Sequence, residues 1–161
     1  FFHSEPSVFF LFYHILFCLS NRAWGQRGGS NMIFESKQTV NGKPVWAVDT
    51  DKLTVTHITK TGEAELHHFW HDCVKYHLHY CEEYFPKRLQ NLVDSGEIYR
   101  YLEELDIKVT DAVGEQAELL MKNNREYQIA NEMGDLYKVG AIGNNCRQEA
   151  RDMVFESMVY V

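Results

Sequence analysis

Alternation of apolar and polar positions is the main pattern in residues 32–66, and it predicts a small antiparallel β-meander. Asn41-Gly42 is a strong hairpin signal, because both residues tolerate the positive φ angles of a tight type I′ turn. Residues 53–58 and 64–68 predict two more strands, which a polar turn separates. We expect a sheet of this size to need helices over one face.

Helical spacing replaces this alternation from about Phe69 onward, where apolar side chains recur at steps of three and four residues. The first stripe consists of Phe69, Cys73, Tyr76, Tyr80 and Tyr84. Pro86 suits the first turn of a helix, and the apolar stripe after it continues to Ser95-Gly96. These positions predict a first helical region over about residues 69–95.

Two longer helices are expected to follow this region. Asp94 and Glu97 have the spacing of a helix N-cap and its N3 carboxylate, so they predict the start of a helix there. Its apolar repeat runs from Ile98 to Ala112, and we expect it to end near Asn123-Asn124. A last helix is predicted over about residues 126–160. Because glycine disfavours helix interiors, we expect a break or a close helix crossing near Gly140.

The predicted fold class is therefore α+β. Residues 32–66 form the β-meander, and residues 67–161 form a mainly helical module of three helices, the last two long and packed against each other. Both parts are assigned to a single small domain over residues 32–161, because a chain of this length suits one hydrophobic core.

The first part of the chain is interpreted separately. Its apolar run, residues 8–19, is shorter than the roughly 20 residues that a membrane-spanning helix needs, and no Lys or Arg precedes it as in a signal peptide. The first methionine is Met32, and Gly28-Gly29 can be encoded by a ribosome-binding sequence at a suitable distance before it. We interpret residues 1–31 as translated upstream DNA, with a genuine, disordered leader as the alternative.

The balance of charges narrows the class of partner. The net charge is −7 and the isoelectric point is near 5.6, which disfavours direct nucleic-acid binding because such affinity comes largely from Lys and Arg. A basic protein, such as a recombinase or a defence nuclease, is the expected partner. The four cysteines are spread out and the chain shows no obvious secretory context, so we expect reduced thiols in a cytoplasmic bacterial protein that does not enter a membrane.

One segment carries side chains of the kind that bind metals. Cys73, His77 and Cys81 recur every four residues and would share a helical face, where such ligands can hold zinc. The stripe would extend over about 12 Å of helix, so one ion could use only adjacent members. The competing interpretation is core cysteines with a half-exposed histidine. We favour that interpretation and expect no cofactor.

A second candidate surface is acidic. The predicted helix that begins after Asp94 carries Glu97, Glu103, Glu104, Asp106 and Asp111. Such runs are usually a solvated helix face. The functional alternative is a surface that imitates nucleic-acid phosphates and competes for the basic groove of a CRISPR nuclease or another nucleic-acid-targeting defence nuclease.

No enzymatic role is expected from these patterns. His67-His68-x-x-His71 has the outline of the HExxH metalloprotease motif, but His68 replaces the glutamate that acts there as general base. Ser95-Gly96 is better explained as a junction between helices than as a nucleophile, because the neighbouring motif supplies no histidine.

Two motifs in the helical part resemble the TnpV family of transposon-encoded proteins. The first is Leu89-x-x-Leu92-Val93-x-Ser95-Gly96-x-Ile98-Tyr99-x-x-Leu102-x-Glu104-Leu105-Asp106. The second is Asn144-Asn145-x-Arg147-x-x-Ala150-x-x-x-Val154, closed by Met158-Val159-Tyr160. The resemblance covers residues 76–161. It implies a small accessory protein of a mobile genetic element, and it implies no catalytic residues.

The chain departs from the family where the family has a basic stretch before the Ser-Gly motif. This chain has the His/Cys-rich residues 67–83 there. The function that we predict is therefore a non-catalytic accessory or regulatory module that binds a protein. An acidic nuclease inhibitor is the first alternative, and a His/Cys metal-binding protein is the second.

Overall fold

The computed structural model describes residues 32–161, and both interpretations of residues 1–31 concern a segment outside them. The main sheet is antiparallel, in the order β1-β4-β5-β6. Its strands are β1 (Ile33–Glu35), β4 (Trp46–Asp49), β5 (Thr54–Ile58) and β6 (Ala64–His68). A short hairpin of β2 (Thr39–Val40) and β3 (Lys43–Pro44) turns at Asn41 and Gly42, whose φ angles are 53° and 76°. The predicted β-meander and its hairpin are confirmed.

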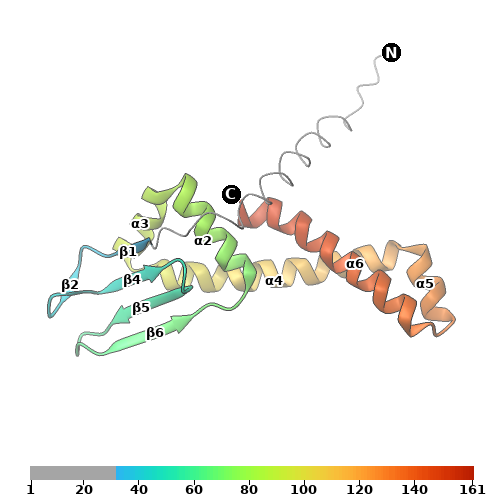
Figure 1. The fold of residues 1–161 in the computed structure, drawn as a ribbon, viewed down its shortest axis with the longest axis horizontal. Coiled ribbons are helices and arrows are strands. Elements are labelled where there is room, and N and C mark those ends of the chain that lie inside the picture. Colours follow the sequence, from blue (N-terminus) through green and yellow to red (C-terminus); the bar gives the residue numbers. More distant parts are fainter. Residues whose placement is uncertain (1–31) are drawn as a thin grey trace, which may run out of the picture. The chain divides into compact units, whose positions relative to one another are not determined.

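The rest of the described chain is helical, so the α+β fold class is confirmed. Its helices are α2 (Asp72–Tyr84), α3 (Pro86–Ser95), α4 (Ile98–Asn123), α5 (Arg125–Glu132), α6 (Leu136–Val154) and a closing π-helical segment, η2 (Phe155–Val159). Figure 1 shows α4 running away from the sheet, α5 turning the chain, and α6 returning beside α4. The predicted packing of two long helices is confirmed, but the structure divides the helical part more finely than the three predicted helices.

The hydrophobic core lies where one face of the sheet meets the helices. Val48 and Val55 are paired in register, and both are fully buried, because alternate strand residues point toward the same face. Helices α2, α3, α4 and α6 and the segment η2 supply the other side of this core: Val74, Leu78, Leu89, Val93, Ile98, Leu102, Val109, Val154 and Val159. Among residues 32–161, no helix is long and apolar enough to cross a membrane.

The first helix begins later than its apolar stripe predicts. Phe69 belongs to the sheet end, since its backbone N–H donates to the Leu53 carbonyl at 3.0 Å. Helix α2 starts at Asp72 and ends at Tyr84, and Pro86 then opens α3 as its first residue. The predicted place of Pro86 in a first helical turn is confirmed, and Pro86 also separates two helices that the sequence pattern joined.

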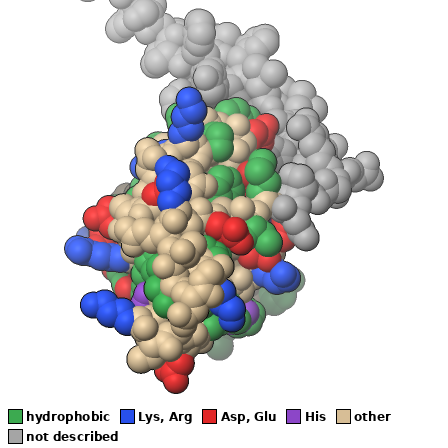
Figure 2. Space-filling view, turned by 90° about the vertical axis from the view of Figure 1, so that its left-hand side faces the viewer, with side chains coloured by type: hydrophobic (Ala, Val, Ile, Leu, Met, Phe, Trp, Pro, Cys, Tyr) green, Lys and Arg blue, Asp and Glu red, His purple; other side chains and the backbone are tan. Residues whose placement is uncertain are grey.

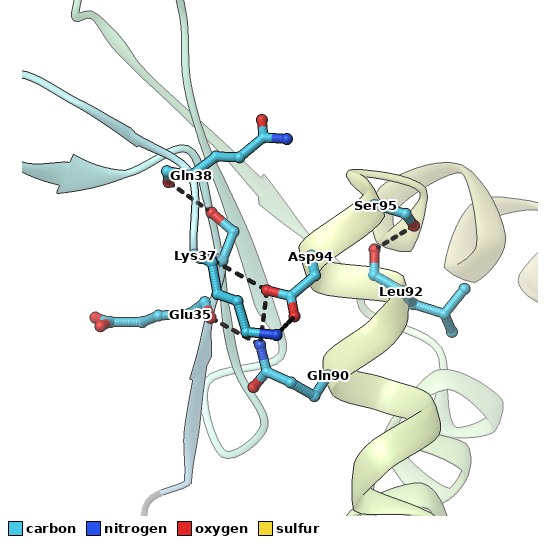
Figure 3. Close-up of polar contacts among 8 residues, drawn as sticks. Glu35, Lys37, Gln38, Gln90, Leu92, Asp94 and Ser95 are labelled. Carbon is cyan, nitrogen blue, oxygen red and sulfur yellow. Dashed lines mark hydrogen bonds and ion pairs between the residues drawn. The ribbon is translucent and has the colours of Figure 1, made fainter.

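Asp94 does not cap α4 as the sequence predicts. It lies in the last turn of α3, where its carboxylate accepts hydrogen bonds from the backbone N–H of Lys37, at 3.0 Å, and from Gln90 (Figure 3). The Lys37 ammonium group completes an ion pair with it at 2.9 Å. A partner 57 residues away therefore outcompetes the local cap, and Glu97 occupies the N-cap position of α4 without a side-chain capping bond.

Helix α3 ends at a Schellman-type cap that explains Ser95-Gly96. The N–H of Gly96 donates to the Val93 carbonyl and the N–H of Glu97 donates to the Leu92 carbonyl, which requires the left-handed φ of 77° at Gly96. An ideal Cβ at Gly96 would lie 2.8 Å from the indole nitrogen of Trp46. Gly96 thus ends α3 and lets β4 approach the helix junction, as predicted for a junction.

The break in the last helix lies at Gly134 and not at Gly140. Gly134 adopts a left-handed φ of 71° between α5 and α6, which stops α5. Gly140 is exposed inside α6 with open space beside it. The close helix crossing is at Gly143, where an added Cβ would meet Met121 and Tyr127, each at 3.6 Å.

Candidate functional site

His77 is the most buried titratable side chain among the predicted site residues. It is 1% exposed, so it is not the half-exposed histidine that the sequence indicated. Its Nδ1 lies 2.7 Å from the Val159 carbonyl oxygen and its Nε2 lies 2.7 Å from the Tyr101 hydroxyl. These partners fix the tautomer, because Nδ1–H must donate to the carbonyl and Nε2 then accepts from the hydroxyl.

This hydrogen-bonded group ties four elements together. Arg88 of α3 donates to the Tyr101 hydroxyl of α4 at 3.3 Å. Tyr101 in turn donates to His77 of α2, and His77 donates to the Val159 carbonyl of η2. Burial lowers the pKa of His77, which keeps the imidazole neutral as this chain of bonds requires. The group is a structural link, and no buried polar side-chain atom of residues 32–161 lacks a hydrogen-bond partner.

The three candidate zinc ligands divide into two environments. The sulfur of Cys81 lies 3.3 Å from His77 Nε2, but that nitrogen is already hydrogen-bonded to Tyr101. Cys73 instead donates its S–H to Asp106 at 3.1 Å. Within the described part of the chain, no group of three or more metal-binding side chains is clustered. A zinc ion on Cys81 and His77 would have to displace the Tyr101 hydroxyl.

Cys73, Asp106 and His71 form a second polar group, at the start of α2. The Asp106 carboxylate lies 2.8 Å from His71 Nδ1 and accepts a hydrogen bond from the Cys73 thiol. Burial, together with the hydrogen bond and the negative charge of Asp106, raises the pKa of Cys73 to about 12. A thiol in that state is a poor nucleophile, since the thiolate is the reactive form.

The predicted acidic residues do not form one continuous surface. Asp106 turns toward α2, and Glu103 accepts a hydrogen bond from the Tyr99 hydroxyl at 3.1 Å. Glu104 lies between Arg100 and Lys108, which donate to it at 2.8 Å and 3.4 Å.

Glu97 and Asp111 lie one heptad before and after Glu104, so they share its side of the helix. Because Arg100 and Lys108 occupy the same side, carboxylates and cations alternate along it. Acidic and basic side chains are also interspersed on the face of the molecule drawn in Figure 2.

An open groove of about 790 Å³ runs along α3. Its lining residues are Tyr84, Phe85, Pro86, Lys87, Arg88, Asn91, Leu92, Ser95 and Glu97. The lining mixes aromatic, basic and acidic side chains, and Arg88 is engaged with Tyr101 and with the Val161 carbonyl. This groove therefore does not define the charge or the shape of a particular ligand.

Among residues 32–161, the clearest exposed apolar surface lies at the turn between α5 and α6. Met133, Leu136 and Tyr137 are 79%, 82% and 90% exposed, and Ile129 beside them is also exposed. We call these four residues the turn surface. Large apolar side chains gathered on an exposed surface are typical of protein interaction sites. Sequence periodicity did not find it, because Gly134 interrupts the helical pattern and Leu136 and Tyr137 fall beyond the break.

No protein-family model, curated protein or solved structure matches this chain.

Proposed function

We propose that this protein is a non-catalytic, cytoplasmic module that binds a basic protein partner and accompanies a bacterial mobile genetic element. The mobile-element context rests on the resemblance of residues 76–161 to TnpV proteins. The binding role rests on one observation, the exposed apolar turn surface.

The polar groups that carry reactive chemistry in other proteins are engaged in this one. Both ring nitrogens of His77 are hydrogen-bonded to groups of the fold, and burial raises the pKa of the Cys73 thiol, which disfavours its reactive thiolate form. By contrast, the side chains of the turn surface contribute little to the core of their own chain. This division supports recognition over catalysis.

A basic partner fits both the whole chain and this site. The net charge of −7 attracts cationic proteins over long distances. The segment that carries the turn surface has three exposed carboxylates, Glu126, Glu132 and Asp135, against two exposed cations, Arg125 and Lys138, so acidic groups are in slight excess at the rim of an apolar contact. Such a rim increases the rate of encounter and the specificity more than the affinity, so most of the binding energy would come from Leu136 and Tyr137.

Affinity capture with the full chain tests this proposal. Nuclease-treated bacterial lysate, and separately a purified CRISPR effector and a recombinase, would be passed over the immobilised protein and a Leu136→Ser/Tyr137→Ser variant. The matched control is Ile107→Ser, which removes an exposed apolar side chain from α4 outside the turn surface. We expect a basic protein to be retained by the wild type and the control and lost from the double variant.

The salt dependence of release distinguishes the contact types. An apolar contact with a charged rim should survive moderate salt, whereas phosphate mimicry should weaken steeply as salt rises. A partner that binds the wild type and the double variant equally, or no reproducible partner at all, would contradict the proposal.

A further inference from the structure

Strand β6 is an open edge of the main sheet. Among residues 32–161 its neighbour is β5 alone, because the strand order ends at β6 (Figure 1). The N–H of Phe69 bonds the Leu53 carbonyl and the N–H of Thr59 bonds the Glu63 carbonyl. With this pairing, successive β6 residues alternate: one directs its backbone N–H and C=O groups toward β5, and the next directs them away from it.

The register identifies the residues whose backbone is free at this edge. Glu65 pairs with His57 and His67 pairs with Val55, both at positions equivalent to the bonded Phe69 and Thr59 pairs. The backbone N–H and C=O groups that point away from β5 therefore belong to Ala64, Leu66 and His68. Ile58, which lies opposite Ala64, agrees with this assignment, because its N–H donates to the Val45 carbonyl on the other side of β5 and not to β6.

Strand β6 lacks several of the usual devices that block an edge, although it carries one charged side chain, Glu65. Edge strands are commonly protected by lysine, by proline, by a bulge or by being very short. Strand β6 has five residues, Ala64–His68, paired in continuous register, and none of them is lysine or proline. The opposite edge strand, β1, has only three residues, Ile33–Glu35.

We propose that β6 pairs antiparallel with β6 of a second copy of this chain, with the twofold axis at Leu66. In that register Leu66 lies opposite Leu66 of the second copy, and Ala64 lies opposite His68. All outward N–H and C=O groups of these residues then find partners at once. A pairing shifted by one residue would place Glu65 or His67, whose backbone groups are already bonded to β5, opposite the outward groups of the second copy.

Side-chain chemistry favours a second copy over an unrelated strand. In this register Glu65 lies opposite His67 of the second copy at a non-hydrogen-bonded position, where side chains of neighbouring strands are closest. The Glu65 side chain is 55% exposed and already accepts from His57 at 3.2 Å, so it can also receive a second imidazole. The symmetry provides this acidic–basic contact twice.

The same pairing covers apolar side chains on the outer face of the sheet. Leu66 is 56% exposed and Trp70 is 81% exposed, with the Trp70 ring stacked on His68 at 5.5 Å between centroids. Leu66 would meet its symmetry equivalent, and Trp70 would reach toward Ala64 of the second copy. Exposed aromatic and aliphatic groups beside an open edge are otherwise a liability for aggregation.

Sedimentation velocity of the full chain over a wide concentration range tests the pairing. We expect the wild type to shift from monomer to dimer as concentration rises. Leu66→Pro removes an N–H that the monomer does not use, so the fold should persist by circular dichroism while dimerisation weakens about tenfold or more. Leu66→Thr is the matched control, because it keeps the N–H and should dimerise more strongly than Leu66→Pro.

Charge exchange tests the register. Glu65→Lys should weaken the dimer by removing the carboxylate opposite His67, and Glu65→Lys/His67→Glu should restore it by placing a Lys–Glu pair at the same position. If the second substitution restores dimerisation, then the loss in Glu65→Lys cannot be explained by misfolding alone. Trp70 fluorescence gives an independent signal, since its emission should move to shorter wavelength with dimerisation in the wild type and not in Leu66→Pro.

Three results would overturn the proposal. A wild-type chain that stays monomeric at every concentration would show that the edge takes another strand or none. Equal dimerisation of the wild type and Leu66→Pro would place the interface elsewhere. Loss of the dimer in the Leu136→Ser/Tyr137→Ser variant, with Leu66→Pro unaffected, would assign it to the turn surface. Partner capture by the turn surface is measured separately, so the two proposals can fail independently.

Discussion

The two halves of α4 follow the same helical repeat but have opposite surroundings. In the first half, Ile98, Leu102 and Val109 are at most 1% exposed, because the sheet, α2, α3 and η2 close around them. In the second half only Ala117 is buried, and Leu119 is 51% exposed. The buried stripe therefore stabilises the fold at the sheet end, although Ile107, on another side of the helix, is 56% exposed. At the turn end, an exposed apolar residue such as Leu119 is available to a partner.

The largest expected effect comes from replacing a leucine by alanine at the sheet end and comparing it with the same replacement at the turn between α5 and α6. Leu102→Ala removes a fully buried side chain and should lower the free energy of unfolding by about 3 kcal/mol, because a cavity remains. Leu136→Ala removes an 82% exposed side chain and should change it by less than about 0.5 kcal/mol. Urea denaturation followed by circular dichroism measures both. Similar losses for the two variants would show that the turn surface is part of the core.

Two glycines extend this comparison to the backbone. Gly96→Ala should destabilise the protein by about 2–3 kcal/mol, because the left-handed φ strains an L residue and the new methyl group would meet Trp46. Gly140→Ala lies in an exposed helix interior with open space beside it and should stabilise by about 1 kcal/mol. Thermal unfolding of both variants would reveal the difference. A destabilising Gly140→Ala would mean that α6 has a neighbour there in solution.

The third prediction concerns the pH dependence that His77 gives to the sheet end. Burial lowers the pKa of this imidazole, so folding favours the neutral form. The unfolded chain then binds more protons at acidic pH. This contribution to stability is fully present above the ordinary histidine value of about 6.5 and is lost as pH falls toward the folded pKa.

His77→Asn isolates the effect. Asparagine can still donate to the Val159 carbonyl, but it has no titrating nitrogen, and no atom of it stands in the place of Nε2 to accept from Tyr101. We expect the variant to be less stable at neutral pH and to lose less stability on acidification, the wild-type loss being at most about 1.4 kcal/mol per pH unit for this group. Urea titrations at about pH 7.5 and 5.5 measure both slopes, and parallel slopes would remove His77 as the cause.

Local patterns predicted the elements whose cause is local. Asn41-Gly42 marked the hairpin, Pro86 marked a first helical turn, and the apolar repeat from Ile98 to Ala112 marked α4. In each case the deciding interaction lies within a few residues of the signal. The α+β fold class followed from the change of period near the end of the sheet.

Distant partners explain what the sequence could not predict. Asp94 has the spacing of a cap, but Lys37, 57 residues away, takes its carboxylate. His77 has the spacing of a metal ligand, but Val159, 82 residues away, takes one of its nitrogens. The turn surface was missed for another reason. Exposure of an apolar residue depends on what packs over it, and spacing along the chain carries no such information.

The smallest expected effect is at the perimeter of the sheet end, where Lys37 meets Asp94. Hydrogen bonding from Lys37 lowers the pKa of Asp94, so the contribution of this carboxylate to stability is present above the ordinary aspartate value. It is lost as pH falls through the folded pKa. Lys37 is largely exposed, so Lys37→Ala should have little effect, and that effect should vanish at high salt.

Asp94→Ala should cost more than Lys37→Ala at any salt concentration, because it also leaves the backbone N–H of Lys37 without its acceptor. The Gln90 amide keeps its bond to the Glu35 carbonyl at 2.8 Å. Lys52→Ala, which breaks an exposed pair with Asp49 inside one turn, is the matched control for the ion pair alone. Urea midpoints at low salt and at about 1 M salt separate the two contributions. Equal midpoints for Asp94→Ala and Lys37→Ala would mean that the ion pair, and not the backbone bond, joins α3 to the start of the sheet.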